Sequence, residues 1–314
     1  MDNKLIVSSS PHMRAKDTTQ TIMLDVIIAL MPAAIASIVI FGYRSFILLM
    51  VCVASCVLSE YVSRKVMKRD NTIMDLSAVV TGMLLAMNLP VALNPVIAAF
   101  GGVIAIVVVK QMFGGIGQNF VNPALTARIV LMNSFPAKMT TWTAPFAYRT
   151  GADAVTTATP LGILAEGGTQ TASYMDLFLG NCAGCLGETS ALALIIGGVY
   201  LVARKVICPC IPCVYIGTAA VLSFVMGRDP LFDILSGGLL LGAIFMATDY
   251  ATSPIHLKAR IVYAIGCGLI TMLIRAYGSL AEGVSYSIMI MNILVPLIEN
   301  ATKPRAFGKE KKKK

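Results

Sequence analysis

Long apolar runs broken by short polar stretches make up most of this chain. A helix needs about 20 apolar residues to cross the hydrocarbon region of a membrane, and fewer where it is buried among other helices. Ten runs meet this requirement, so the pattern predicts an all-α integral membrane protein with about ten transmembrane helices. The expected segments are 22–42, 45–62, 75–93, 95–113, 122–135, 189–204, 211–227, 231–249, 259–277 and 282–298.

Two of these segments contain residues that interrupt a helix. "LLAMNLPVALNP" (84–95) carries Asn and Pro pairs, and "GGIGQNFVNPALTARIVLM" (114–132) places Pro123 directly after the helix-capping residue Asn122. Free backbone groups at membrane depth are tolerated only where they face protein or a water-lined cavity. Interrupted helices in matching positions of two halves mark the sites of repeat-built transporters. The glycine-rich stretch 236–254 is a partial counterpart in the second half.

The long interval between the fifth and sixth segments divides the chain into two halves. We therefore expect two five-helix repeats with interrupted helices, joined by a polar loop. The predicted organisation is a first repeat over 1–135, an extracytoplasmic loop over 136–188, a second repeat over 189–300 and a basic cytoplasmic tail over 301–314.

Composition supports the membrane assignment and excludes a soluble domain. Hydrophobic residues make up 57% of the chain and charged residues 13%, with a mean hydropathy of +0.78, whereas soluble domains carry roughly 25% charged residues. The net charge of +9 comes from short Lys and Arg patches, which are typical of cytoplasmic loops and can contact anionic membrane lipid. The chain lacks the basic and aromatic alternation of a nucleic-acid groove, so nucleic acid is not an expected partner.

The positions of Lys and Arg also predict the orientation in the membrane. With ten crossings, both termini, the patch 63–69 and the pair 204–205 fall on one side, which the positive-inside rule identifies as cytoplasmic. The opposite side holds the interval 136–188, whose basic residues are only Lys138 and Arg149. We therefore expect both termini in the cytoplasm.

Five of the eight cysteines form two motifs that can suggest a metal site. Cys182 and Cys185 form a CxxC, and Cys208, Cys210 and Cys213 form "CPCIPC". The predicted topology puts the two motifs on opposite sides of the membrane, so they cannot share one cluster. Small apolar residues at helix ends are the favoured interpretation, and a ligand set completed by a partner protein is the alternative. The remaining cysteines lie in apolar runs at Cys52, Cys56 and Cys267.

Charged side chains within apolar runs are costly and are functional by default. They are Asp25, Arg128, Glu188, Asp249, Arg275 and Glu282. Glu188 and Asp249 are expected at membrane interfaces, whereas Asp25 and Arg128 lie deeper. Arg128 either serves a site or pairs with a carboxylate such as Asp25. An ion path through this chain would use Asp25, Glu188 and Asp249.

Asn119 and Asn122 lie three residues apart where a helix is expected to begin. One interpretation is helix capping alone. The other is hydrogen bonding to a planar polar ligand, because each side-chain amide offers both a donor and an acceptor.

A threonine cluster, "DAVTTATPLGIL" (153–164), lies within the polar interval. A hydroxyl nucleophile needs an activating base, and the only histidines, His12 and His256, are expected on the other face of the membrane. We therefore expect no catalytic residue here. A threonine modified by another enzyme needs only exposure and small neighbours, and "TTATP" provides both.

This cluster resembles the flavin-attachment motif of the Rnf/Nqr membrane proteins. In that motif an acidic residue, here Asp153, is followed by Ser or Thr, here Thr156, and then by Ala and Thr. The last threonine, here Thr159, carries FMN through a phosphodiester, and Thr157 stands where family members often have Gly. Further blocks match in family order at 114–136, 186–201, 247–254 and 274–300.

Within this family the chain looks like the RnfD component of Rnf complexes. The resemblance implies a ten-helix fold in a prokaryotic plasma (inner) membrane, and a component that is not catalytic alone. It implies covalent FMN at Thr159 and a second, non-covalent flavin, riboflavin or FMN, at Asn119 and Asn122. On the same interpretation, Arg128 balances the negative charge of a reduced flavin. It further implies electron transfer between ferredoxin and NAD coupled to Na⁺ or H⁺ movement. The implied partners are the other Rnf subunits, including a second covalent-FMN subunit and an NADH-reactive subunit, and a separate flavin transferase.

Three other interpretations remain. A cofactor-free secondary transporter or channel fits the interrupted helices equally well, but it has no use for the threonine motif. The NqrB component of the sodium-pumping quinone reductase fits the motif, but the long N-terminal extension expected of it is not present in this sequence. A structural membrane anchor does not explain Asp25, Arg128 or the Asn pair.

Overall fold

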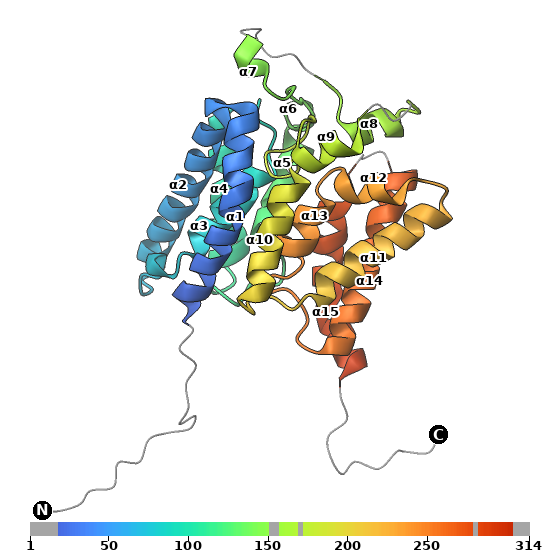
Figure 1. The fold of residues 1–314 in the computed structure, drawn as a ribbon. Helices are drawn as coiled ribbons and strands as arrows, with labels where there is room; N and C mark the ends of the chain where they lie inside the picture. The colour runs from blue at the N-terminus through green and yellow to red at the C-terminus, as the bar shows by residue number, and fades with distance from the viewer. Residues whose placement is uncertain (1–17, 151–156, 169–171, 279–281, 304–314) are drawn as a thin grey trace, which may run out of the picture.

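The computed structural model describes residues 18–150, 157–168, 172–278 and 282–303, and these residues form an all-helical fold (Figure 1). Four helices are long and apolar enough to cross a membrane. They are α1 (Thr19–Phe41), α2 (Tyr43–Val66), α14 (Leu257–Tyr277) and α15 (Val284–Thr302). This confirms the prediction of an all-α, multi-pass membrane protein.

Shorter helical elements complete the fold. They are η1 (Ile73–Asp75), α3 (Ser77–Met87), α4 (Pro95–Val103), the π-helical η2 (Ile104–Gln111), α5 (Pro123–Ser134), α6 (Pro136–Met139), α7 (Ala147–Thr150), α8 (Pro160–Ala165), α9 (Tyr174–Leu179), α10 (Ala191–Ala203), α11 (Cys210–Val225), α12 (Pro230–Leu235), α13 (Leu239–Leu241) and the π-helical η3 (Gly242–Met246).

The predicted segment 231–249 is not one continuous helix. It is divided into α12, α13 and η3. Gly237, between α12 and α13, has a φ of +66°, and a Cβ there would lie 2.6 Å from Leu161 Cδ1. Only glycine adopts this conformation readily, so the backbone turns at this point. Helical residues occupy each of the other expected segments, while the count of ten crossings and the two-repeat arrangement stay predictions.

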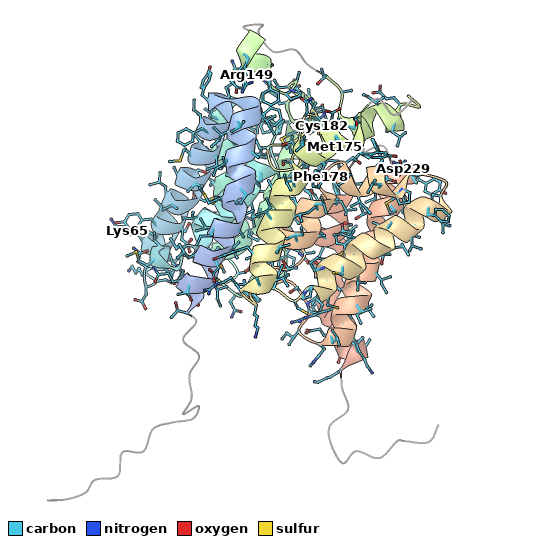
Figure 2. All side chains as sticks on the ribbon, in the orientation of Figure 1. Lys65, Arg149, Met175, Phe178, Cys182 and Asp229 are labelled. Carbon is cyan, nitrogen blue, oxygen red and sulfur yellow. The ribbon has the colours of Figure 1, made fainter. Side chains whose placement is uncertain are left out.

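The first and last described helices reach the same end of the molecule. Figure 1 shows α1 beginning and α15 ending at the end opposite α6–α9. One cavity agrees with this arrangement, because Thr19 and Ile22 at the start of α1 and Glu299 near the end of α15 all line it. Figure 2 places Lys65 toward this end, and Arg149 and Cys182 toward the other. We call these the inner and outer ends, following the predicted orientation.

Hydrogen bonds between buried hydroxyls join the helices of the second half. Tyr215 on α11 lies 2.7 Å from Thr271 on α14 and 3.1 Å from Ser287 on α15, measured between hydroxyl oxygens. Lipid supplies no competing donors or acceptors, so such bonds help to hold membrane helices together. Many apolar side chains on the outside of the fold are exposed, such as Leu58 on α2 at 62%, as expected for contact with lipid.

Candidate functional site

Thr159 lies at the start of α8. Its hydroxyl oxygen accepts a hydrogen bond from the Gly162 amide at 3.0 Å and caps the helix, and Pro160 occupies the first helical position. Threonine followed by proline is a common helix start, so the local sequence accounts for this geometry. The side chain of Thr159 is mostly covered, with the residue 7% exposed, and it lines a cavity.

This outer cavity has a volume of about 610 Å³ and lies between α5, α8, the start of α15 and the loop after α6. It is lined by Arg128, Ile129, Met132, Thr140, Thr141, Trp142, Thr157, Ala158, Thr159, Gly162, Glu166, Glu282, Ser285 and Tyr286. Its wall therefore combines one aromatic residue of the outer loop, Trp142, with charged groups from the helical part of the protein. The threonine motif and the buried charges meet at one site.

Arg128 on α5 is the centre of a buried polar cluster at this cavity. Its Nη1 donates to Glu188 Oε1 at 3.0 Å and to Asn88 Oδ1 at 2.8 Å. Its Nη2 donates to Glu282 Oε2 at 2.5 Å and lies 3.4 Å from Cys185 Sγ. One guanidinium therefore holds two carboxylates from distant parts of the chain.

Backbone pairing explains how Glu188 reaches Arg128. The amide of Gly187 donates to the Met87 carbonyl at 2.8 Å, and the amide of Leu186 donates to the Leu89 carbonyl at 3.2 Å. These bonds hold the loop before α10 against the end of α3, where the helix stops before Pro90. The interruption predicted from the sequence thus provides backbone acceptors, and it places Asn88 beside the arginine.

A second cavity, of about 730 Å³, opens among helices of both halves toward the inner end. Its lining includes Asn119, Asn122, Asp249, Lys110, Ser77, Thr81, Thr248 and Glu299 together with apolar residues such as Phe245 and Ile207. A mostly apolar wall with a few polar groups is typical of small-molecule sites.

The two asparagines of this inner cavity are positioned by different bonds. Asn122 caps α5, since its Oδ1 accepts from the amides of Ala124 at 3.0 Å and Leu125 at 3.3 Å, which confirms the capping prediction. Asn119 donates from Nδ2 to the Val121 carbonyl at 3.3 Å. In the described part of the chain, Asn119 Oδ1 has no hydrogen-bond partner, so this oxygen can accept a bond from a ligand.

Comparison with known proteins identifies the family. The model of the NQR2, RnfD, RnfE family matches residues 6–308. This chain belongs to that family. Its relatives include the D subunit of a Na⁺-translocating ferredoxin:NAD⁺ oxidoreductase complex from Acetobacterium woodii, 52% identical over 313 residues, which cover 99% of this chain and 97% of the relative.

Other relatives in the family carry related names. The D subunit of a proton-translocating ferredoxin:NAD⁺ oxidoreductase complex from Clostridium ljungdahlii is 44% identical, over 98% of this chain and 97% of the relative. The D subunit of an ion-translocating oxidoreductase complex from Stutzerimonas stutzeri is 37% identical, over 94% and 93%. The family resemblance expected from the sequence motifs is confirmed.

In this family member Arg128 does not pair with Asp25, which corrects that alternative. Asp25 lies near the start of α1, where its carboxylate is 3.2 Å from Arg204 Nη2 and accepts from the Tyr200 hydroxyl at 2.8 Å. Arg128 lies almost two turns further along α5 than Asn122, and it lines the outer cavity rather than the inner one. Arg128 and the two asparagines therefore border different cavities.

Glu188 is buried within the protein, in the loop shortly before α10. The residue is 4% exposed, and burial together with the nearby carboxylate of Glu282 raises the pKa of Glu188 to about 8. Asp249 lines the inner cavity and accepts a hydrogen bond from the Thr252 hydroxyl at 3.1 Å. The three acidic residues of the predicted ion path therefore lie at three separate places and form no single cluster.

A second buried ion pair was not predicted from the sequence. Lys110 Nζ on η2 lies 2.9 Å from Glu60 Oε2 on α2 and donates to Ser77 Oγ at 2.7 Å. Gln111 also donates to Glu60, at 3.0 Å. Glu60 and Lys110 each lie near the end of an apolar run of the sequence. A charged residue in such a run was the signal that could have revealed the pair. Lys110 borders the inner cavity, so this pair fixes part of its wall.

The remaining residues of the threonine motif are Asp153, Thr156 and Thr157. Asp153 and Thr156 lie outside the described residues. Thr157 is exposed, and its amide donates to the Trp142 carbonyl at 3.2 Å. Thr157 and Thr159 both line the outer cavity.

The two cysteine motifs are separated by α10. Cys182 and Cys185 lie in the outer loop, where burial raises the pKa of Cys182 to about 12. Cys208 and Cys213 are exposed near the start of α11. All eight cysteines are unpaired, so neither motif forms a disulfide.

Proposed function

We propose that this chain is the flavin-carrying membrane subunit of an Rnf-type ferredoxin:NAD⁺ oxidoreductase. It holds FMN covalently at Thr159 and a second, non-covalent flavin, riboflavin or FMN, in the inner cavity. Electron transfer between them is coupled to Na⁺ or H⁺ translocation. The observation that carries the proposal is the position of Thr159, the last residue of the attachment motif, on the wall of a cavity that is large enough for a flavin. The names of the relatives support the complex and its overall reaction.

The outer cavity fits a covalent flavin in size and in chemistry. Its volume of about 610 Å³ lies within the range of roughly 300–1,000 Å³ that is usual for small-molecule sites. Trp142 can stack on a planar ring. Arg128 lies on the same wall, and its guanidinium, although shared by Glu188 and Glu282, contributes a positive potential beside a reduced flavin.

The inner cavity fits a neutral planar ligand. Its volume is about 730 Å³. Lys110 on its wall is already paired with Glu60, and Asp249 and Glu299 are acidic. This lining favours a ligand without phosphate, because a phosphate would meet two carboxylates and no unpaired cation among the lining residues described. Asn119 offers its amide oxygen to a ring N–H.

Helix α5 connects the two cavities. Asn122 at its start borders the inner one, and Arg128, six residues later, borders the outer one. At 1.5 Å per residue this separation is about 9 Å along the helix. A flavin supplies the redox chemistry when bound, and the protein supplies binding, orientation and electrostatics. The two sites are therefore held close together by one rigid element.

In this proposal the chain is one subunit of a larger membrane complex. Its partners are the other Rnf subunits, among them a second subunit with covalent FMN and an NADH-reactive subunit, and a flavin transferase attaches the FMN. The setting is the prokaryotic inner membrane with cytoplasmic termini. Asp25, Glu188 and Asp249 form the proposed ion path. Ion uptake by the reconstituted complex should fall when each of these three residues is replaced by its amide. Undiminished ion uptake in all three variants would exclude that path.

The decisive experiment is expression with a flavin transferase followed by in-gel fluorescence of the denatured protein. We expect fluorescence in the wild type and in Thr157→Ala, and none in Thr159→Ala. Peptide mass spectrometry then locates the adduct. Loss only in Thr157→Ala would move the attachment by two residues. A wild type without covalent flavin would overturn the proposal and favour a cofactor-free transporter, the function that the interrupted helices also suit.

A further inference from the structure

A second, much smaller cavity lies beside the outer one. Its volume is about 10 Å³, which is close to the minimum space for one water-sized particle. Glu188, Glu282, Thr159 and Thr189 are among the residues that line it. Oxygen-bearing side chains therefore surround a space that can hold a single small ion.

At this cavity the number of carboxylates is greater than the number of cations that contact them. Arg128 is within salt-bridge distance of both Glu188 and Glu282, at 3.0 Å and 2.5 Å. Arg275 contributes a positive potential at Glu282, but its ion pair is with Asp233, at 3.9 Å, and it donates to the carbonyls of Asp233 and Ser236. Two carboxylates thus contact one guanidinium, and a buried negative charge needs a further partner.

One carboxylate oxygen marks where that partner would bind. Glu188 Oε2 is buried and accepts no hydrogen bond from a donor in the described part of the chain, and the Glu188 and Glu282 carboxyl groups lie close enough to share a proton. Its side chain is 2% exposed. Ligand atoms of Glu188, Glu282 and Cys185 all lie within 4.8 Å of one another. Burial raises the pKa of the Cys185 thiol well above its ordinary value, so this group is neutral and adds no charge.

The chemistry of these groups selects the class of ligand. Carboxylate and hydroxyl oxygens suit hard cations, and transporters bind Na⁺ or H⁺ where helices are interrupted. A divalent ion would be repelled more strongly by the guanidinium of Arg128. We propose that Glu188 and Glu282 bind one small monovalent cation, Na⁺ or H⁺, in this cavity, with Arg128 as the fixed counter-charge.

The site has a consequence for the flavin. Thr159 lines both this cavity and the outer one, so a cation here lies next to the proposed attachment point. An electron added to the flavin then strengthens cation binding, and a bound cation makes reduction easier to the same extent. This coupling rests on the proposed function, whereas the cation site itself does not.

The first experiment tests the site without using the flavin. The full-length chain is purified in detergent, and its melting temperature is measured against Na⁺ at constant ionic strength and against pH. We compare the wild type with Glu188→Gln, Glu282→Gln and the control Asp70→Asn, at an exposed position that lines none of the three cavities. A ligand of the folded state raises the melting temperature in a saturable way.

For a Na⁺ site, the wild type and the control Asp70→Asn gain stability with Na⁺ more than with K⁺. For a proton site, these two proteins gain stability only when the pH is lowered. In both cases Glu188→Gln loses the response, because the amide is a neutral isostere. A wild type that responds to neither ion, or a Glu188→Gln variant that responds as the wild type does, overturns the proposal.

The second experiment tests the coupling in the complex that carries the flavin. One cation bound per electron shifts the FMN potential by about 59 mV for each tenfold change in cation concentration. The part of that shift that belongs to this site should disappear in Glu188→Gln and persist in the control Asp70→Asn. Equal shifts of the FMN potential in all variants overturn the proposed coupling. Absence of covalent FMN overturns the proposed function instead, and the melting experiment still decides the cation site.

Discussion

Arg128 Nη2 and Glu282 Oε2 lie 2.5 Å apart on the wall of the outer cavity, although 154 positions separate the two residues in sequence. Arg128 belongs to α5 in the first half of the chain, and Glu282 precedes α15 in the second. Glu188 in the intervening loop joins the same arginine. The three parts of the chain therefore meet at one guanidinium, beside the threonine that we propose as the flavin attachment point.

Replacing Arg128 by Ala should destabilise the folded protein strongly. The change leaves two buried carboxylates without their shared partner, and breaking a buried pair costs about 3–5 kcal/mol. Unfolding in detergent by a chemical denaturant measures the loss. The control is Arg149→Ala, an exposed residue, for which we expect a change within about 0.5 kcal/mol. Similar stability of the two variants would show that the cluster does not support the fold.

Stability should also depend on pH through Glu188. Its pKa is raised by burial from an ordinary 4.5 to about 8, so the folded protein favours the protonated form. The resulting stabilisation is complete below pH 4.5 and is lost as pH rises through about 8. Melting temperatures between pH 6 and 9 should therefore fall more steeply for the wild type than for Glu188→Gln. Parallel curves would contradict a raised pKa.

Asn119→Leu should reduce the amount of non-covalent flavin that copurifies with the protein. The substitution removes the amide oxygen that can accept a hydrogen bond from a ligand in the inner cavity, and the loss of one such bond weakens binding by roughly 0.5–1.5 kcal/mol, or up to about tenfold. Chromatography of flavin released by acid denaturation measures it. The control is Asn71→Leu, at an exposed position, which should retain the wild-type amount of non-covalent flavin. The amount of covalent flavin should be unchanged in both variants.

The buried pair of Lys110 and Glu60 should behave as a unit. Lys110→Met alone leaves a carboxylate that is 1% exposed without its cation, so we expect a loss of about 3–5 kcal/mol. Lys110→Met combined with Glu60→Gln should recover a large part of that loss. A double-mutant cycle from unfolding curves tests this. Additive effects would show that the two side chains do not interact.

The exposed cysteines test the orientation in the membrane. Cys208 and Cys213 are exposed at the inner end, whereas Cys182 is mostly buried with its pKa raised to about 12. A membrane-impermeant maleimide should therefore label Cys208 and Cys213 only in inside-out vesicles. Variants that retain one of these cysteines assign the signal. Labelling in intact cells would place α11 the other way round and reverse the predicted topology.

The apolar pattern alone determined the class of this protein and most of its elements. Membrane helices are selected by local hydrophobicity, which is written directly in the sequence, so α1, α2, α14 and α15 were predictable. The cap at Asn122 was equally predictable, because capping depends on neighbouring residues. The threonine motif pointed to Thr159 for the same reason, since an attachment motif is a local feature of the chain.

Only the tertiary structure decided which charged groups meet. The sequence suggested Asp25 for Arg128, yet the arginine pairs with Glu188 and Glu282. Arg128 follows Asn122 by six residues, yet α5 carries the two side chains into different cavities. A long-range ion pair depends on how helices far apart in the chain pack together, and hydrophobic periodicity carries no information about that packing. The partners of buried charges, and the small cavity between them, therefore appear only in the folded protein.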